Sequence, residues 1–256
     1  MSAASCRTLA LTLIATASLA LNTPVRAADV QSPYSDRADI AQYLSADPQA
    51  EIAAARSAAP HAVSDQAEIL VLGRDGFAPA VHGNNGFVCY VGRSWEKDFR
   101  DPEFWNPKVR TPQCWNAAAA RSLLPRYLER TRWVLAGATR EELATRSKAA
   151  WIAHRFGPPE PQSMAFMMSK DQYIADPSGG GQARWYPHVM FFVQTDADST
   201  WGANTPGSPI FASTSADEPL TTFFVVVPRW ADGSLGPYVE PVPAPPASGA
   251  DGQHRH

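Results

Sequence analysis

The sequence has little cysteine and little that resembles a metal site. Its 256 residues contain three cysteines, and HExxH and CxxC pairings are absent. The histidines before the C-terminal tail are widely separated: His61, His82, His154 and His188. Zinc and related metals need closely spaced ligands of these types. The sequence therefore predicts no metal, and we read the terminal "HRH" as incidental.

Motifs that hold nucleotides or build common hydrolase sites are also missing. The sequence has no G-x-S-x-G elbow, no Walker loop and no strand-linked G-x-G-x-x-G. The "GGGQAR" stretch lacks the lysine and the helix start that cradle a phosphate. We therefore expect no cofactor.

Basic patches are absent too. The formal net charge is −3, and no run of Lys or Arg is present that could bind a phosphate backbone. Nucleic acid is therefore not an expected partner.

No apolar run is long enough to cross a bilayer comfortably. The longest, Leu9–Leu21, follows Arg7 and precedes the small residues Val25 and Ala27. This layout predicts a signal peptide over residues 1–27, with a retained membrane anchor as the alternative. The mature chain is then expected to lack a transmembrane segment and to be exported, to the periplasm or outside the cell.

Composition divides the rest of the chain into three parts. Residues 28–64 are alanine-rich and predict an N-terminal helical segment, with Asp47 and Pro48 as a helix start. Residues 65–238 predict a single α+β domain. Residues 239–256 are rich in Pro, Ala and Gly, and we expect a disordered tail because such a segment buries too little apolar surface.

The domain opens with three apolar runs, Ala67–Gly73, Phe77–Gly83 and Phe87–Trp95, separated by "GRDG" and "GNNG". Gly and Asn tolerate the backbone of tight turns, so the pattern predicts an antiparallel β-meander. Pro79 cannot donate to a ladder, which places the second strand at an edge. In the third strand, Cys89 lies on the face opposite Tyr90.

Helices and further strands follow this meander. Three prolines over residues 101–116 predict an irregular loop, and residues 117–156 predict helices interrupted at Pro125 and restarted by a Thr139–Glu142 capping box. Residues 176–184 predict a mobile loop or flap, and the apolar runs around it predict more strands. The expected fold is α+β, an antiparallel sheet built from the N-terminal meander and the C-terminal strands, with the central helices packed on one face.

Cys89 and Cys114 are the two cysteines outside the predicted signal peptide. In an exported protein such a pair indicates a disulfide. The alternative is that Cys89 is a nucleophile activated by His188 or His82.

His188 is the candidate catalytic residue, because it enters a predicted strand beside aromatic residues and a Gly-rich loop. It suits a general base or a ligand contact, and it equally suits a buried, hydrogen-bonded histidine. Aromatic residues near strand ends build ligand platforms or seal a core. The other candidate ligand-binding residues are Arg93, Trp105, Trp185 and Tyr186. Arg93 is expected to pair with a ligand acid or with Glu96.

These patterns favour a non-catalytic binding or envelope-associated protein. Its aromatic groove, around His188 and the loop near Trp105, is expected to take a small molecule, a sugar or a peptide. The alternative is a hydrolase with His188 as general base and Cys89, Ser169 or a bound water as nucleophile. The sequence does not indicate an oligomeric state.

Overall fold

The computed structural model describes residues 33–175, 185–194, 198–215 and 218–237. The predicted signal peptide, the predicted tail and the Gly-rich loop at 176–184 all lie outside the described residues.

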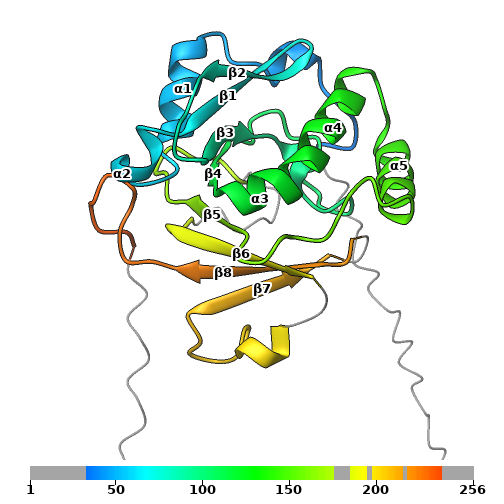
Figure 1. Ribbon diagram of the computed structural model, residues 1–256. Helices are drawn as coiled ribbons and strands as arrows, with labels where there is room; N and C mark the ends of the chain where they lie inside the picture. Colours follow the sequence, from blue (N-terminus) through cyan, green and yellow to red (C-terminus); the bar gives the residue numbers. More distant parts are fainter. Residues whose placement is uncertain (1–32, 176–184, 195–197, 216–217, 238–256) are drawn as a thin grey trace, which may run out of the picture. The chain divides into compact units, whose positions relative to one another are not determined.

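One eight-stranded sheet runs through the domain, with strand order β2-β1-β3-β4-β5-β6-β8-β7 (Figure 1). All its neighbours are antiparallel except β1 and β3. The α+β class is therefore confirmed. The strands are β1 (Glu68–Gly73), β2 (Gly76–Val81), β3 (Val88–Gly92), β4 (Thr111–Trp115), β5 (Met164–Met167), β6 (His188–Gln194), β7 (Ile210–Thr214) and β8 (Leu220–Val226).

The N-terminal strands do not form the predicted three-stranded meander. β1 and β2 make the expected antiparallel hairpin, but β3 pairs in parallel with β1, with Ile69 opposite Cys89. The chain after β2 passes close to the start of β1, where a Cβ on Gly83 would meet the Glu68 nitrogen at 2.1 Å. "GNNG" is therefore part of a crossing connection and not a tight hairpin turn. β2 is outermost, so the edge position inferred from Pro79 is confirmed.

β4 lies where the prolines predicted an irregular loop, so that prediction was wrong for Thr111–Trp115. Pro112 pairs with Val91 of β3, whereas β5 pairs with β4 at Cys114 and Trp115. At Pro112 the strand has a described neighbour on one side only, which makes the missing N–H tolerable. β7 lies at the other edge of the sheet.

The helices begin where local sequence signals place them. Asp47 caps the first helix by accepting from the Gln49 N–H at 2.9 Å, and Thr139 and Glu142 form the predicted capping box. Pro125 lies in the first turn of a new helix, which explains the predicted interruption. The helices are α1 (Pro48–Arg56), α2 (His61–Ser64), α3 (Ala117–Ser122), α4 (Leu124–Leu135) and α5 (Arg140–Ile152), with 3-10 turns η1 (Ile40–Gln42), η2 (Ser94–Glu96) and η4 (Asp198–Trp201).

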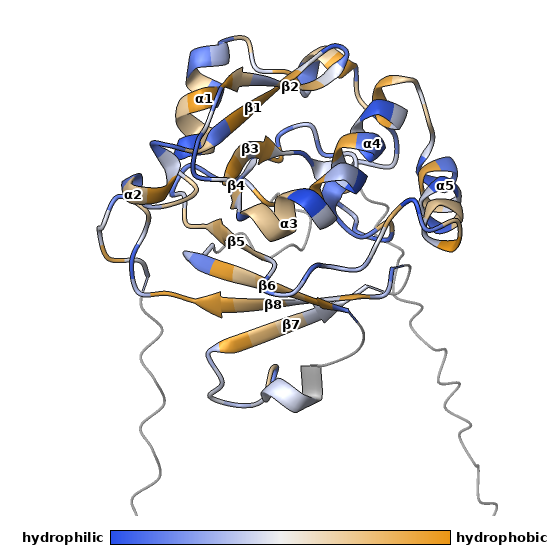
Figure 2. Cartoon of the chain, viewed as in Figure 1, coloured by the Kyte–Doolittle hydropathy of each residue, from blue (hydrophilic) through white to orange (hydrophobic). Residues whose placement is uncertain are grey.

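Helices cover both faces of the sheet: α1 of the N-terminal segment lies on one face, and the central helices α3 and α4 lie on the other. α1 packs through Ala55 on the face that carries Cys89. α3 and α4 pack through Leu123 and Leu124 on the face that carries Tyr90. Figure 2 shows hydrophobic residues in most strands and mixed colours on α4, whose polar residues matter below. The predicted opposition of Cys89 and Tyr90 is therefore confirmed, and the face of Tyr90 carries the site.

Candidate functional site

A cavity of about 280 Å³ lies between the Tyr90 face of the sheet and α4. Part of its wall is aromatic, from Phe99, Trp115, Tyr127, Phe192 and Phe224. Seven charged residues also line it: Arg93, Glu96, Lys97, Asp98, Arg126, Arg130 and Glu218. A mostly apolar wall with a few convergent polar groups is the usual make-up of a small-molecule site.

A chain of hydrogen bonds fixes the carboxylate of Glu96. The Trp115 indole N–H donates to Gln113 Oε1 at 3.2 Å, which leaves the Gln113 Nε2 amide to donate to Glu96 Oε2 at 2.9 Å. The Tyr90 hydroxyl donates to the same oxygen at 3.2 Å. β3 and β4 thus hold one oxygen of Glu96 with two neutral donors.

Gly92 makes room for this arrangement. A Cβ at this position would lie 2.5 Å from Glu96 Oε2 and 2.6 Å from Gln113 Nε2. Both distances are shorter than van der Waals contact, so any larger residue would push the carboxylate out of place. A glycine at the end of β3 is therefore needed for Glu96 and Gln113 to take these positions.

Burial raises the pKa of Glu96 to about 7, although Gln113, Tyr90 and the more distant charges of Arg93 and Arg130 lower it. The residue as a whole is partly exposed, but its Oε1 atom is shielded from solvent. Desolvation penalises the charged form of a carboxyl, and here it outweighs the donors. At neutral pH Glu96 is therefore close to half protonated and ready to take up or release a proton.

Two buried arginines of α4 share one carboxylate. Arg130 Nη2 lies 2.8 Å from Glu218 Oε1, and Arg126 Nη1 lies 3.1 Å from Glu218 Oε2. The Arg126 guanidinium also lies 4.6 Å from the Tyr127 ring centroid, and that of Arg130 lies 4.4 Å from the ring of Phe99. Cation–π contacts of this kind stabilise a buried guanidinium, but they do not neutralise its positive charge.

Three polar atoms of this cluster have no hydrogen-bond partner among the described residues: the donors Arg126 Nε and Nη1, and Glu96 Oε1. Of these, Arg126 Nη1 still forms the ion pair with Glu218. Buried polar atoms normally form hydrogen bonds with protein groups or with ordered water. A buried polar atom without such a partner therefore needs an explanation. Both residues line the same cavity, and the two atoms themselves, Arg126 Nε and Glu96 Oε1, have almost no solvent-accessible surface.

Arg93 is buried and its guanidinium is occupied by the protein. Nη2 donates to both Glu51 oxygens at 2.9 and 3.0 Å, Nε donates to the Tyr43 carbonyl at 2.7 Å, and Nη1 donates to the Val91 carbonyl. The sequence suggested pairing with a ligand acid or with Glu96. The structure instead pairs Arg93 with Glu51 of α1, which ties that helix to the end of β3.

Trp105 is buried in a cluster with Tyr43 and Phe104, and its carbonyl accepts from the Tyr43 hydroxyl at 2.7 Å. Trp185 packs against a different cluster, the one that holds Met190. The structure therefore gives no support to a groove that joins Trp105 to His188. Trp95, Phe104 and Trp115 are also buried, so these aromatic residues seal the core.

His188 begins β6 and is only 6% exposed. Its Nδ1 donates to the Tyr186 carbonyl at 2.9 Å, because a carbonyl can only accept, and Nε2 has no partner among the described residues. The Trp185 and Phe224 rings pack around the imidazole. Burial lowers the pKa of His188 to about 4, against a smaller raising effect of the Tyr186 carbonyl. The imidazole is therefore neutral at pH 7.

Acid should destabilise the protein through His188. The pKa is about 4 in the folded chain against an ordinary 6.5, so between these values the unfolded chain binds more protons. The stabilising contribution is complete above about pH 6.5 and is lost as the pH falls. In urea unfolding, wild type should lose about 2 kcal/mol more than His188→Asn between pH 7 and pH 5. Parallel pH profiles for the two proteins would contradict the assignment.

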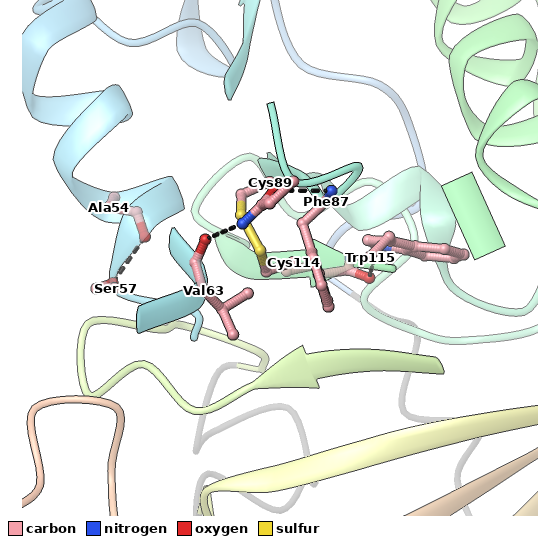
Figure 3. The surroundings of a disulfide bond; sticks show 9 residues. Ala54, Ser57, Val63, Phe87, Cys89, Cys114 and Trp115 are labelled. Atoms are coloured by element: carbon pink, nitrogen blue, oxygen red, sulfur yellow. Dashed lines mark hydrogen bonds between the residues drawn. A yellow bond between two sulfur atoms is a disulfide. The ribbon is translucent and has the colours of Figure 1, made fainter. Parts of the chain in front are cut away.

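Cys89 and Cys114 form the predicted disulfide, and both are fully buried. They are direct partners across β3 and β4, so the bond joins neighbouring strands. Figure 3 shows Val63 and Phe87 beside the bridge. Since both sulfurs are bonded to each other, Cys89 has no thiol to act as a nucleophile. Ser169, the other proposed nucleophile, is buried with its hydroxyl 2.6 Å from that of Ser57.

The sequence reasoning missed most of this cavity. From the sequence, Glu96 was only a possible partner for Arg93. Arg126, Arg130 and Glu218 were not predicted as site residues. One signal was available, because Arg126, Arg130 and Val134 follow each other at four-residue spacing on a helix that packs on the core. Two cationic side chains on the same helix face as a buried valine indicate that a group of opposite charge lies in the interior.

No protein-family model, curated protein or solved structure matches this chain. Within the described residues, no helix is long and apolar enough to cross a membrane. The same residues contain no group of three or more His, Cys, Asp or Glu side chains that could hold a metal ion.

Proposed function

We propose that this protein is an exported binding protein that holds a small polar ligand, without transforming it, in the cavity between the sheet and α4. The observation that carries the proposal is the coincidence of unsatisfied polar atoms, Arg126 Nε and Glu96 Oε1, with one aromatic-lined cavity. A volume of about 280 Å³ suits a ligand of few atoms. This cavity takes the place of the groove around His188 and Trp105 that the sequence suggested.

Export is the second part of the proposal. The Cys89–Cys114 disulfide supports it, because such bonds persist in oxidising compartments and are rare in the cytosol. The predicted signal peptide over residues 1–27 supports it from the sequence.

The direct test is a thermal-shift screen of the mature protein against small polar compounds. Compounds that bind the cavity should raise the melting temperature of wild type, because a ligand that binds only the folded state stabilises it. They should have little effect on Arg126→Met, which removes the unsatisfied donor but leaves Glu218 paired with Arg130.

Arg132→Met is the matched control for this screen. Arg132 lies on the same helix, and its pair with Glu129 is exposed. Compounds that stabilise wild type and Arg132→Met but not Arg126→Met support the proposal. Equal stabilisation of all three proteins would place the binding elsewhere, and a large screen without any stabilising compound would refute the proposal.

A hydrolase that uses His188 as general base is the second candidate. A neutral imidazole with an unpartnered Nε2 favours it. The nucleophile would have to be Ser169 or a bound water, because Cys89 is in the disulfide. Unchanged turnover by His188→Asn, on any substrate that wild type consumes, would eliminate this candidate.

A further inference from the structure

We infer that the ligand of this cavity is a small organic anion, that its acidic group lies against Arg126, and that it binds when Glu96 carries a proton. The inference rests on the proposed function and goes beyond it by naming the chemical class of the ligand and a proton-linked control of binding.

The balance of charge around the cavity is the first argument. Three of the seven charged groups that line it have a carboxylate or a cation of their own: Arg93 with Glu51, Lys97 with Asp101, and Asp98 with Arg100. Arg126 and Arg130 differ, because they share the single carboxylate of Glu218. The cluster therefore holds one more positive than negative charge unless Glu96 is ionised. A buried surplus charge is costly, and an anion would neutralise it.

The hydrogen bonding around Glu96 is the second argument. Its Oε2 accepts from two neutral donors, Gln113 and Tyr90, and no described cation forms a hydrogen bond or ion pair with it. Glu96 is thus not the counter-ion of Arg126. When protonated it becomes a donor at Oε1, the oxygen without a described partner. Two residues that line the cavity then carry donors without a described partner, Arg126 Nε and the Glu96 hydroxyl, and a carboxylate has two oxygens to accept from them.

Other titratable groups also face Glu96, but they keep their charge near neutral pH. Tyr90 from β3 has a pKa raised well above its ordinary value by burial, so it remains a neutral donor. Burial lowers the pKa of Arg126, but Tyr127 and Glu218 raise it by more, so its net shift is upward. Arg93, just before η2, and Arg130 of α4 lower the pKa of Glu96 by their positive charge. The pKa of Glu218 is lowered by Arg126 and Arg130 despite its burial, so it stays ionised. With the pKa of Glu96 raised to about 7, Glu96 is the group that titrates across the range tested.

The test uses benzoate as the anionic probe, because its ring suits the aromatic wall, and benzamide as its neutral counterpart. Isothermal titration of the mature wild-type protein is carried out at pH 6 and pH 8. The dissociation constant for benzoate should rise about tenfold between them, following the fraction of Glu96 that is protonated. Glu96→Gln keeps an uncharged donor at this position, so its affinity for benzoate should be the same at both pH values. Benzamide should bind wild type more weakly than benzoate at pH 6.

The outcomes separate this inference from the proposed function. Benzoate binding that is independent of pH in wild type, or benzamide binding as tight as benzoate, would overturn the inference while leaving a ligand site in place. Absence of benzoate binding at pH 6 would also overturn it, if neutral compounds of the thermal-shift screen stabilise wild type but not Arg126→Met. If no compound of either kind binds, both proposals fail.

Discussion

Glu51→Gln should lower the free energy of unfolding by about 3–5 kcal/mol, the cost of leaving a buried charge without its partner. The side chains of Arg93 and Glu51 are 0% and 2% exposed, so water cannot replace the lost carboxylate. Burial already lowers the pKa of Arg93, against the raising effect of Glu51. Urea unfolding of wild type and variant at pH 7 measures the difference.

Glu160→Gln is the matched control for this experiment. It breaks an ion pair with Arg121 in which both side chains are exposed, and such pairs contribute little to stability. Its unfolding midpoint should match that of wild type. A second variant, Glu51→Met with Arg93→Met, removes both charges and should recover part of the loss. The interpretation fails if Glu51→Gln is no more harmful than Glu160→Gln.

Removal of the disulfide should be the other large effect. The double variant Cys89→Ala, Cys114→Ala opens a loop that spans 25 residues of sequence separation. On the chain-entropy estimate this costs about 3 kcal/mol, and alanine leaves no buried hydroxyl at either position. The urea midpoint of the double variant should therefore fall well below that of wild type.

Mass spectrometry of the exported protein controls this result. Two alkyl groups should attach to the protein after reduction and none before it. The measured mass should match that of a chain that begins at Ala28. Wild type unfolded with a reductant present should behave like the double variant. If wild type and the double variant unfold at the same urea midpoint without reductant, the disulfide does not stabilise the sheet.

Much of the local structure could be predicted because its causes lie close together in the sequence. The Asp47–Pro48 helix start and the Thr139–Glu142 capping box depend on neighbouring residues, and Pro79 marks an edge strand by its missing N–H alone. The pairing of the cysteines followed from their number.

The rest depends on contacts between distant residues. The parallel pairing of β1 and β3 arises from the path of the chain past Gly83, where a turn signal suggested a hairpin. The cavity could not be assembled from sequence because its partners are far apart, with a sequence separation of 88 for Arg130 and Glu218. Spacing along the chain does not reveal which carboxylate meets which cation.

Side-chain NMR of the Arg126 Nε–Hε group tests the central claim most directly, because this is the donor without a described partner in the cavity. Benzoate added at pH 6 should move the Arg126 Hε resonance downfield, as expected when a carboxylate accepts its hydrogen bond, while that of the exposed Arg132 stays in place. An Arg126 resonance that does not move, while benzoate shifts resonances elsewhere on the protein, would contradict the account.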